Sequence, residues 1–567
     1  MAVPRRPKSL PERRPSETDR RATDVSIMDA MRSRVPRRRS WLRGVVASTC
    51  LVGLAVLLAL ARGAVGAPAG EFHVGVPRLP ATLDPADARD PSQLLAIRLV
   101  YQGLVAFGDR GDIEPGLATA WTVSRDGLVW TFRLRQDVQL HDGTPLGPDE
   151  VVQALAERIS DDEPPDKAPA WVRPFRGAAR IVREVRRGEG TSIQIVVAQP
   201  YAPLLALLAH PGLAIAVPRS GGPRVGSGPY RSVELTPDRF ALEAATTWRG
   251  EAPLSARLIL HPVADDAAAL AGLAPGGLLH ASMVTAPPSW AAVGLQVVSG
   301  PTWRMGLLAL RADRGLTSRK TVRQAVALAL DPGLLRPALG QWAVPHAAWL
   351  PPGAWAVRDG GPLLFDAARA RRLLAQVAPI DPSMTLLASD QVSGPEAAAI
   401  TEAIRVSLGA PGFRVRVRLE PPDAAEAAAR QGTAELTLHE ETLDVNDPDL
   451  FFRRLLGTDG ATPGTATNVA FFRSPLVDGM LTRAGQLGYR PERLRLYQRL
   501  QTLLADELPY VPLYVRVQWM VARPEVKGIR LDPGGLHRFE RMMFEPPPAP
   551  PPRAPLNPLS GLPPARP

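Results

Sequence analysis

The stretch that decides the fold spans residues 115–152 and reads PGLATAWTVSRDGLVWTFRLRQDVQLHDGTPLGPDEVV. Residues 124–127 predict a turn, because the glycine in fourth position supplies the positive φ that such turns use. Residues 128–135 then alternate large apolar side chains with smaller or polar ones, which is the pattern of a half-buried strand. A second turn at 141–145 precedes an amphipathic helix that we expect to begin near Asp149.

Trp130 and His141 are expected to be structural residues of this segment. Trp130 is one of the large side chains of the predicted strand, and His141 opens the predicted second turn. Aromatic side chains in such strands mostly supply buried area. The segment therefore indicates a fold and does not locate a ligand.

Three shorter motifs are informative in combination with this stretch. They are YQGL at 101–104, GSGPY at 226–230 and VRQA at 322–325. Together with residues 115–152 they resemble the family 5 extracytoplasmic solute-binding proteins, the peptide and nickel receptors of ABC importers. The resemblance covers about residues 71–543 and follows the family's own order along the chain.

The resemblance implies an α/β chain with a two-lobed periplasmic binding protein-like fold of type II and an extra subdomain on lobe I. It places lobe I in residues 70–111, 225–300 and 512–545, the extra subdomain in 112–224, and lobe II in 301–511. Residues 546–567 hold 11 prolines and predict an extended tail. The ligand is expected in the cleft between the lobes, which close about two or three crossover strands.

The same resemblance implies the partners of the protein. A monomer is expected to capture a small solute, an oligopeptide or similar, and to deliver it to an ABC permease heterodimer and its ATPases. No cofactor and no metal ion is expected. Because a fold does not fix a role, a membrane-anchored sensory or chaperone module with the same fold is an alternative.

Other function classes find little support in the residues. The chain has no Gly-x-Ser-x-Gly elbow, no His-Glu-x-x-His pair and no Walker motif. Its eight histidines are scattered, with no two at helical ligand spacing. The GSG at 226–228 lacks a third glycine, and Pro229 removes an amide that a phosphate cradle needs. An exported hydrolase remains an alternative, because triads can assemble from distant residues.

The net charge of +11 is a property of the N-terminus rather than of the body. Residues 1–69 hold 14 basic and 5 acidic residues, a net charge of +9, which leaves +2 for the rest of the chain. A nearly neutral body does not favour nucleic acid as a partner. The arginines that alternate along 413–420 are therefore expected to form the solvated face of a strand.

Residues 44–61 form an uncharged run of 18 residues between Arg43 and Arg62. The basic segment 1–43 precedes this run, and small residues follow it up to Ala69, which completes the three parts of a secretory signal. Residues 38–43, RRSWLR, also resemble a twin-arginine signal, so a periplasmic location is expected. The alternative is a membrane anchor at 44–61. The only cysteine, Cys50, lies in this run, so the chain can form neither an internal disulfide nor a thiolate metal cluster.

The best candidate for a ligand contact is Asp444, in the acidic segment HEETLDVNDPDLFF at 439–452. In the peptide-binding members of the family that the chain resembles, a carboxylate in the matching segment pairs with the α-ammonium of the peptide. A buried carboxylate is costly unless it is paired, so one in a closed cleft favours a cationic group. The alternative is that Asp444 is a solvated loop residue, while Asp447 or Asp449 caps the following helix.

Glu441 is a further candidate for a ligand contact, and the segment departs from the family there, because relatives often carry an aromatic residue. Dipeptide receptors use an arginine for the peptide carboxylate, and residues 389–392 offer none. This argues against a free-dipeptide receptor and leaves room for a cationic or otherwise different solute. Four further side chains are secondary candidates for the cleft, with core or hinge packing as the alternative for each: Trp303, Tyr230, His439 and Asn468.

Overall fold

The computed structural model of the chain describes residues 70–88, 90–108, 111–159, 181–285, 294–358, 365–377, 379–391 and 397–546. All of these residues belong to one compact unit. The predicted export signal and almost all of the predicted proline-rich tail lie outside the described residues, so they stay predictions. Within the described ranges, no helix has the length and apolar character that a membrane crossing requires.

One sheet of 11 strands connects two hydrophobic cores. The strands follow the order β10-β11-β12-β1-β13-β20-β14-β19-β16-β18, and β15 (Ala343–Pro345) pairs with β20 from the side. We call the part around the core that contains Phe72 and Phe240 lobe I. The part around the core that contains Leu386 and Phe452 is lobe II. The sheet is continuous from one lobe to the other because β14 and β20 belong to both.

Lobe I is built on parallel strands that bury both of their faces. β1 (Glu71–Val76) pairs in parallel with β12 (Arg257–Pro262) on one side and with β13 (Ala281–Val284) on the other. Next to β12 lies the hairpin of β11 (Phe240–Ala244) and β10 (Tyr230–Leu235). The helix α2 (Pro91–Val100) begins at a capping box of Asp90 and Gln93 and ends where Tyr101 becomes extended.

The extra subdomain is a four-stranded antiparallel sheet in the order β4-β5-β7-β6, with α3 packed on it. Its β5 lies within the strand predicted at 128–135, and its helix begins one residue before Asp149. Trp130 is 6% exposed, and the ring nitrogen Nε2 of His141 lies 3.0 Å from the carbonyl of Gly228, so both residues are structural. The bounds are β4 (Ala118–Val123), β5 (Val129–Leu134), α3 (Pro148–Ile159), β6 (Val182–Arg187) and β7 (Ser192–Val197).

Lobe II packs helices against the far end of the large sheet. β16 (Ser383–Ser389) lies between β18 (Arg414–Glu420) and β19 (Leu436–Thr442), parallel to both. A short 3-10 turn (Leu316–Ser318) leads into α7 (Lys320–Ala329), which carries the VRQA motif. The other long helices are α9 (Ala367–Gln376), α10 (Ala397–Gly409), α11 (Pro422–Gln431), α12 (Pro448–Leu456), α13 (Pro475–Gln486) and α14 (Arg490–Glu507).

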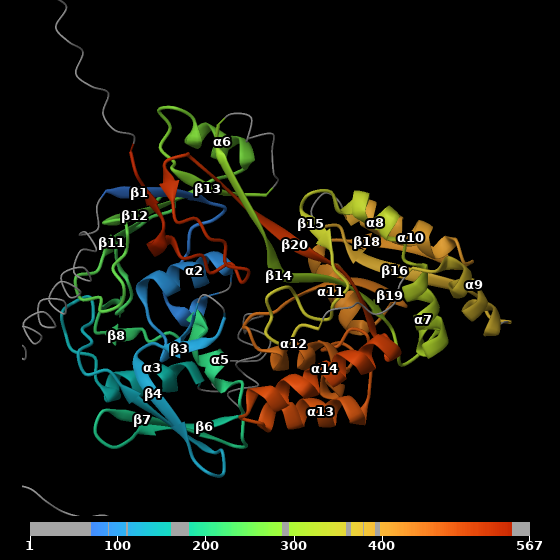
Figure 1. Ribbon diagram of the computed structural model, residues 1–567, viewed down its shortest axis with the longest axis horizontal. Helices are drawn as coiled ribbons and strands as arrows, with labels where there is room; N and C mark the ends of the chain where they lie inside the picture. The colour runs from blue at the N-terminus through green and yellow to red at the C-terminus, as the bar shows by residue number, and fades with distance from the viewer. Residues whose placement is uncertain are drawn as a thin grey trace, which may run out of the picture. The chain divides into compact units, whose positions relative to one another are not determined.

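Two long antiparallel strands carry the chain between the lobes. β14 (Gln296–Leu310) pairs with β20 (Tyr510–Ala522) over most of its length, from Gln296↔Ala522 to Ala309↔Tyr510. β20 also pairs with β13 of lobe I, and β14 pairs with β19 of lobe II. Figure 1 shows β14 and β20 running side by side between these two regions. The boundaries predicted after residues 300 and 511 fall inside these crossing strands.

Shorter elements complete the connections. They are β2 (Val105–Phe107), β3 (Ile113–Pro115), α5 (Leu204–Leu208), β8 (Val217–Arg219), β9 (Gly222–Val225), α6 (Asp266–Leu273), α8 (Pro332–Leu339), β21 (Val526–Lys527) and β22 (Met543–Phe544).

Three histidines that are far apart in the sequence meet in lobe I, two on adjacent strands and His280 directly before β13. His73 of β1 and His261 of β12 have ring nitrogens 3.0 Å apart, and the backbone N–H of His73 donates to Nδ1 of His280 at 3.2 Å. Burial lowers the pKa of His261 and of His280 to about 4. Burial also lowers the pKa of His537 to about 4 and that of His210 to about 3.

The protein is therefore expected to lose stability as the pH falls from about 6.5 towards 4. A histidine that is buried in its neutral form takes up a proton more readily in the unfolded chain, whose histidine pKa is about 6.5. Its contribution to stability is complete above that pH and is lost as the pH falls towards the folded-state pKa. A falling urea midpoint from pH 6.5 to pH 5 is the measurement that checks this.

His210→Asn isolates one of these groups. Nδ1 of His210 accepts a hydrogen bond from the backbone N–H of Gly212, and an asparagine oxygen can replace that acceptor without titrating. The variant is expected to lose about 1.5 kcal/mol less than the wild type between pH 6.5 and pH 5. Equal losses in the two proteins would contradict the role given to His210.

Candidate functional site

The predicted ligand segment runs from the end of β19 to the start of α12. Oδ1 of Asp447 accepts a hydrogen bond from the backbone N–H of Asp449 at 3.0 Å, which makes Asp447 the N-cap of α12. Pro448 takes the first helical position, where a missing N–H costs nothing. Of the two residues predicted as alternatives for this cap, Asp447 is the one that takes it.

A buried ion pair fixes this corner of lobe II. Arg493 of α14 donates to both oxygens of Asp447, at 2.7 and 2.8 Å, and the two side chains are 7% and 6% exposed. Asp449 pairs with Arg453 one helical turn away, at 2.7 Å. Because a bidentate guanidinium–carboxylate pair fixes orientation as well as distance, residues 443–447 are held in one position on lobe II.

Four side chains gather between the end of β19 and α12: His439, Glu441, Asp444 and Arg454. We call them the carboxylate cluster. Arg454 donates through Nη1 to Asp444, and its Nη2 lies 2.5 Å from Glu441 and donates to the carbonyl of Thr442 at 2.5 Å. Nε2 of His439 lies 3.3 Å from Glu441, and it carries the ring proton because a carboxylate only accepts.

The two carboxylates of the cluster share one guanidinium, that of Arg454. Burial opposes the ionisation of Glu441, but Arg454 and His439 outweigh it, and the pKa of Glu441 is lowered. Burial dominates at Asp444, where Glu441 adds repulsion, and the pKa of Asp444 is raised despite Arg454. A second cation close to Asp444 would offset both effects.

Of the two carboxylates in the cluster, Asp444 is the one with an oxygen that accepts no hydrogen bond from the described residues. Its Oδ2 accepts from Arg454, whereas its Oδ1 has no hydrogen-bond partner within the described part of the chain. The Asp444 side chain is 20% exposed, and both oxygens of Glu441 are already engaged. An ammonium group, which donates and is positive, suits this position.

Trp303 lies next to this cluster on β14. Its carbonyl accepts from the backbone N–H of Leu443 at 3.1 Å, and its own N–H donates to the carbonyl of Pro533 at 2.8 Å. The indole is 9% exposed, and its Nε1 has no partner among the described residues. Trp303 thus joins the end of β19 to a loop of the segment that follows β20.

The carboxylate cluster lies beside the seam between the lobes. Val445 and Leu450, on either side of the start of α12, are buried in the core of lobe I. Nearby, the backbone N–H of Ala202 in the extra subdomain donates to the carbonyl of Gly485 in α13 at 2.7 Å. The segment that carries Asp444 therefore contacts both lobes. A ligand site between the lobes requires such a segment.

Two of the secondary candidates lie elsewhere, fully buried and hydrogen-bonded within one lobe. The hydroxyl of Tyr230 donates to the carbonyl of Ser255 at 3.3 Å in the core of lobe I. Asn468 donates to the carbonyls of Gly457 and Phe472 inside lobe II. The structure thus brings together His439, Glu441 and Asp444, with Trp303 on the adjacent strand, and gives Tyr230 and Asn468 packing positions.

Arg454 is the member of the cluster that the sequence prediction missed. A signal for it exists, because residues three or four apart share a face of a helix. Arg454 follows Phe451 by three positions and Leu450 by four, and both of these are buried. An arginine at the buried side of α12, ten residues after an acidic loop, needed a carboxylate partner nearby.

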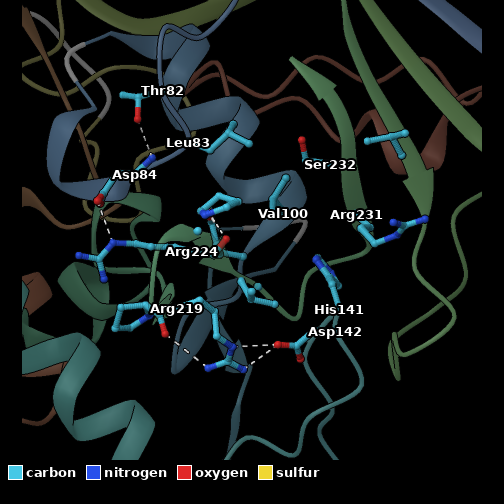
Figure 2. A pocket seen from close by; sticks show the side chains of 17 residues that line it. Thr82, Leu83, Asp84, Val100, His141, Asp142, Arg219, Arg224, Arg231 and Ser232 are labelled. Atoms are coloured by element: carbon cyan, nitrogen blue, oxygen red, sulfur yellow. Dashed lines mark hydrogen bonds and ion pairs between the residues drawn. The ribbon is translucent and has the colours of Figure 1, made fainter.

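A cavity of about 750 Å³ lies in lobe I and contains none of the predicted site residues. Figure 2 shows Arg219 turned towards Asp142 and Arg224 towards Asp84 on its wall. Each of its three arginines already pairs with a carboxylate: Arg219 with Asp142, Arg224 with Asp84 and Arg231 with Glu243. The volume suits a small molecule, but each arginine of the wall is already paired with a carboxylate. No residue of lobe II lines the cavity.

Within the described ranges, no three side chains of histidine, cysteine, aspartate or glutamate are placed to hold a metal ion.

The sequence matches one family model, described as "Bacterial extracellular solute-binding proteins, family 5 Middle", over residues 112–463. This match spans more than half of the chain. It includes residues 115–152 and all four residues of the carboxylate cluster.

Curated relatives of similar length agree with this match. The glutathione-binding protein GsiB of Escherichia coli O1:K1 is 26% identical over 489 residues, which cover 82% of this chain and 92% of that protein. The protein of the same name from Salmonella typhimurium is 26% identical over 458 residues, with coverage of 76% and 86%.

Solved structures share the fold at lower identity. HbpA2 from Haemophilus parasuis superposes with a TM-score of 0.75 at 20% identity, covering 84% of this chain and all of that one. The murein tripeptide-binding protein MppA, in its unliganded open form, gives a TM-score of 0.72 at 20% identity with coverage of 84% and 98%. The predicted α/β periplasmic binding protein fold with two lobes is confirmed.

Proposed function

Because the chain belongs to the bacterial extracellular solute-binding proteins of family 5, we propose that it captures a peptide-like solute with a cationic group at the seam between its lobes. Asp444 is the residue that receives this group. The protein serves as the solute-binding component of an ABC-type importer. Lobe I and lobe II close over the solute about β14 and β20.

One observation carries this proposal: two carboxylates share the single guanidinium of Arg454, and Asp444 keeps a free acceptor beside the seam. Oδ1 of Asp444 has no partner within the described residues, while Arg454 and His439 satisfy the rest of the cluster. An ammonium group bound there gains a charge-assisted hydrogen bond, which is about twice as strong as a neutral one. It also neutralises a carboxylate whose burial raises its pKa.

The relatives suggest the first solute to test. Glutathione carries one ammonium group, and proteins that are 25% to 26% identical to this chain are named for binding it. An ammonium group at Asp444 and an extended backbone along β19 match this class of solute. The solute then passes to a membrane permease pair driven by ATPases, and the protein acts as a monomer on the periplasmic side.

Native mass spectrometry of the protein isolated from its own cell envelope tests this proposal. The expected spectrum contains a second species that is heavier by the mass of one small solute, and fragmentation of that species releases a compound with a primary amine. A co-purified solute without any cationic group would overturn the assignment of Asp444.

A further inference from the structure

Asn446 lies two residues after Asp444 and joins three parts of the protein. Its Oδ1 accepts a hydrogen bond from the backbone N–H of Trp355 in lobe II at 3.2 Å. Its Nδ2 donates to the carbonyl of Gly111, at the edge of the extra subdomain, at 3.2 Å. The side chain is 4% exposed, so both bonds are shielded from water. One buried amide therefore connects the solute-binding segment to both sides of the seam.

Glycine is the only residue type that fits at position 111, opposite this amide. Its φ is +71°, in the left-handed region, and a Cβ at this position would lie 2.1 Å from Nδ2 of Asn446. Asn446 could turn away only by giving up Trp355 and leaving a buried amide unsatisfied, which is costly. The close approach of the two lobes at this point thus depends on a glycine in lobe I.

The contact is surrounded by others that bridge the same seam. Val445 packs in the core of lobe I, and the hydroxyl of Tyr201 in the extra subdomain lies 3.4 Å from Asp449 of α12. The loop around Asn446 cannot move far on lobe II, because Arg493 holds its neighbour Asp447. Opening of the lobes must therefore break the contact on the side of Gly111.

We propose that Asn446 and Gly111 form a clasp that holds the lobes in contact and positions Asp444 for the solute. Neither residue donates to or accepts from the solute. Asn446 acts through the lobe arrangement, and the strength of solute binding depends on it because closure is part of the binding equilibrium. This inference rests on the proposed function for its effect on the solute but not for its effect on the lobes.

Gly111→Ala tests the clasp, with Gly221→Ala as the matched control. Gly221 has a φ of +70° and no atom within 4 Å of the position of a Cβ, so it carries the same backbone cost without the clash. Spin labels at V123C in the extra subdomain and Y489C in lobe II, both exposed, report the distance between the lobes in the full chain with C50S.

The double electron–electron resonance distances are expected to shift in one variant only. Gly111→Ala should transfer the short-distance population to longer distances without any solute, while Gly221→Ala should match the parent protein. Thermal unfolding of both variants checks that each lobe stays folded. Equal distance distributions in Gly111→Ala and the parent would overturn the clasp, and so would a parent protein that shows only the long distance.

Asn446→Asp tests the same clasp from the other side. The aspartate keeps an acceptor for the N–H of Trp355 but removes the donor to Gly111 and places a negative charge against its carbonyl. Affinity for glutathione, measured by calorimetry, is expected to fall about tenfold, and the interlobe distance should shift as in Gly111→Ala. A distance shift without glutathione binding in any variant would keep the clasp and reject the solute, whereas unchanged distances would reject the clasp.

Discussion

Replacing Arg454 with methionine is expected to lower the free energy of unfolding at pH 7 by about 3–5 kcal/mol. Methionine fills much of the same space but leaves Glu441 and Asp444 without their shared cation. Arg454 is 18% exposed, and burial weighs against the ionised form of both acids, so water cannot replace the guanidinium fully. Urea unfolding of the variant and the wild type measures the difference.

The pH dependence of this loss identifies its cause. Without Arg454, burial raises the folded-state pKa of both acids above the values of the unfolded chain. A group with a raised pKa contributes stability below its unfolded pKa and loses it as the pH rises through the folded pKa. The deficit of Arg454→Met relative to the wild type is therefore smaller at pH 5 than at pH 7.

Arg405→Met is the control for this experiment. Arg405 pairs with Glu402 on the surface, where the two side chains are 45% and 54% exposed, and such pairs contribute little. Its loss of stability is expected to be small and equal at both pH values. A deficit of Arg454→Met that is the same at pH 5 and pH 7 would show that lost packing, rather than unpaired carboxylates, causes it.

Replacing Asp444 with asparagine is expected to weaken the binding of a cationic solute by about 2–5 kcal/mol, a loss of thirtyfold or more. Asparagine has nearly the same shape but removes the charge that the ammonium group meets. Arg454 keeps Glu441 as a partner in this variant, so the fold is expected to persist. Calorimetry with the wild type and the variant gives the ratio of affinities.

Asp142→Asn separates the two possible locations of the solute. Asp142 lies on the wall of the lobe I cavity and pairs with Arg219, far along the chain from the carboxylate cluster. The affinity of this variant for the solute is expected to equal that of the wild type. A large loss with Asp142→Asn and none with Asp444→Asn would move the binding site into lobe I.

Local patterns in the sequence were sufficient to predict many elements. The turn and strand around Trp130 and the strand with alternating arginines at β18 follow from neighbouring residues alone. Family resemblance added the two lobes.

Contacts between distant residues could not be predicted in this way. His73 and His261 lie on different strands and His280 directly precedes a third, and only the parallel pairing of β1 with β12 and β13 brings them together. Arg454 was visible as a charge on the buried side of α12, but its sharing between Glu441 and Asp444 depends on the angle at which α12 leaves β19. The seam contact of Asn446 with Gly111 spans 335 residues and has no local signal.

The proposed site lies in the loop between β19 and α12, beside the seam. Glu441 adds a second carboxylate to the cluster, and Arg454 neutralises only one of the two. The proposed preference for a cationic group rests on these two carboxylates together with the free oxygen of Asp444.

The most direct test of the central claim is calorimetry of the full chain with glutathione and with N-acetylglutathione. Acetylation removes the positive charge of the amine and leaves the rest of the solute unchanged. Glutathione is expected to bind, and its acetylated form is expected to bind at least thirtyfold more weakly. The same loss is expected for glutathione itself when Asp444 is replaced by asparagine. Equal affinities for the two forms would contradict capture of an ammonium group by Asp444.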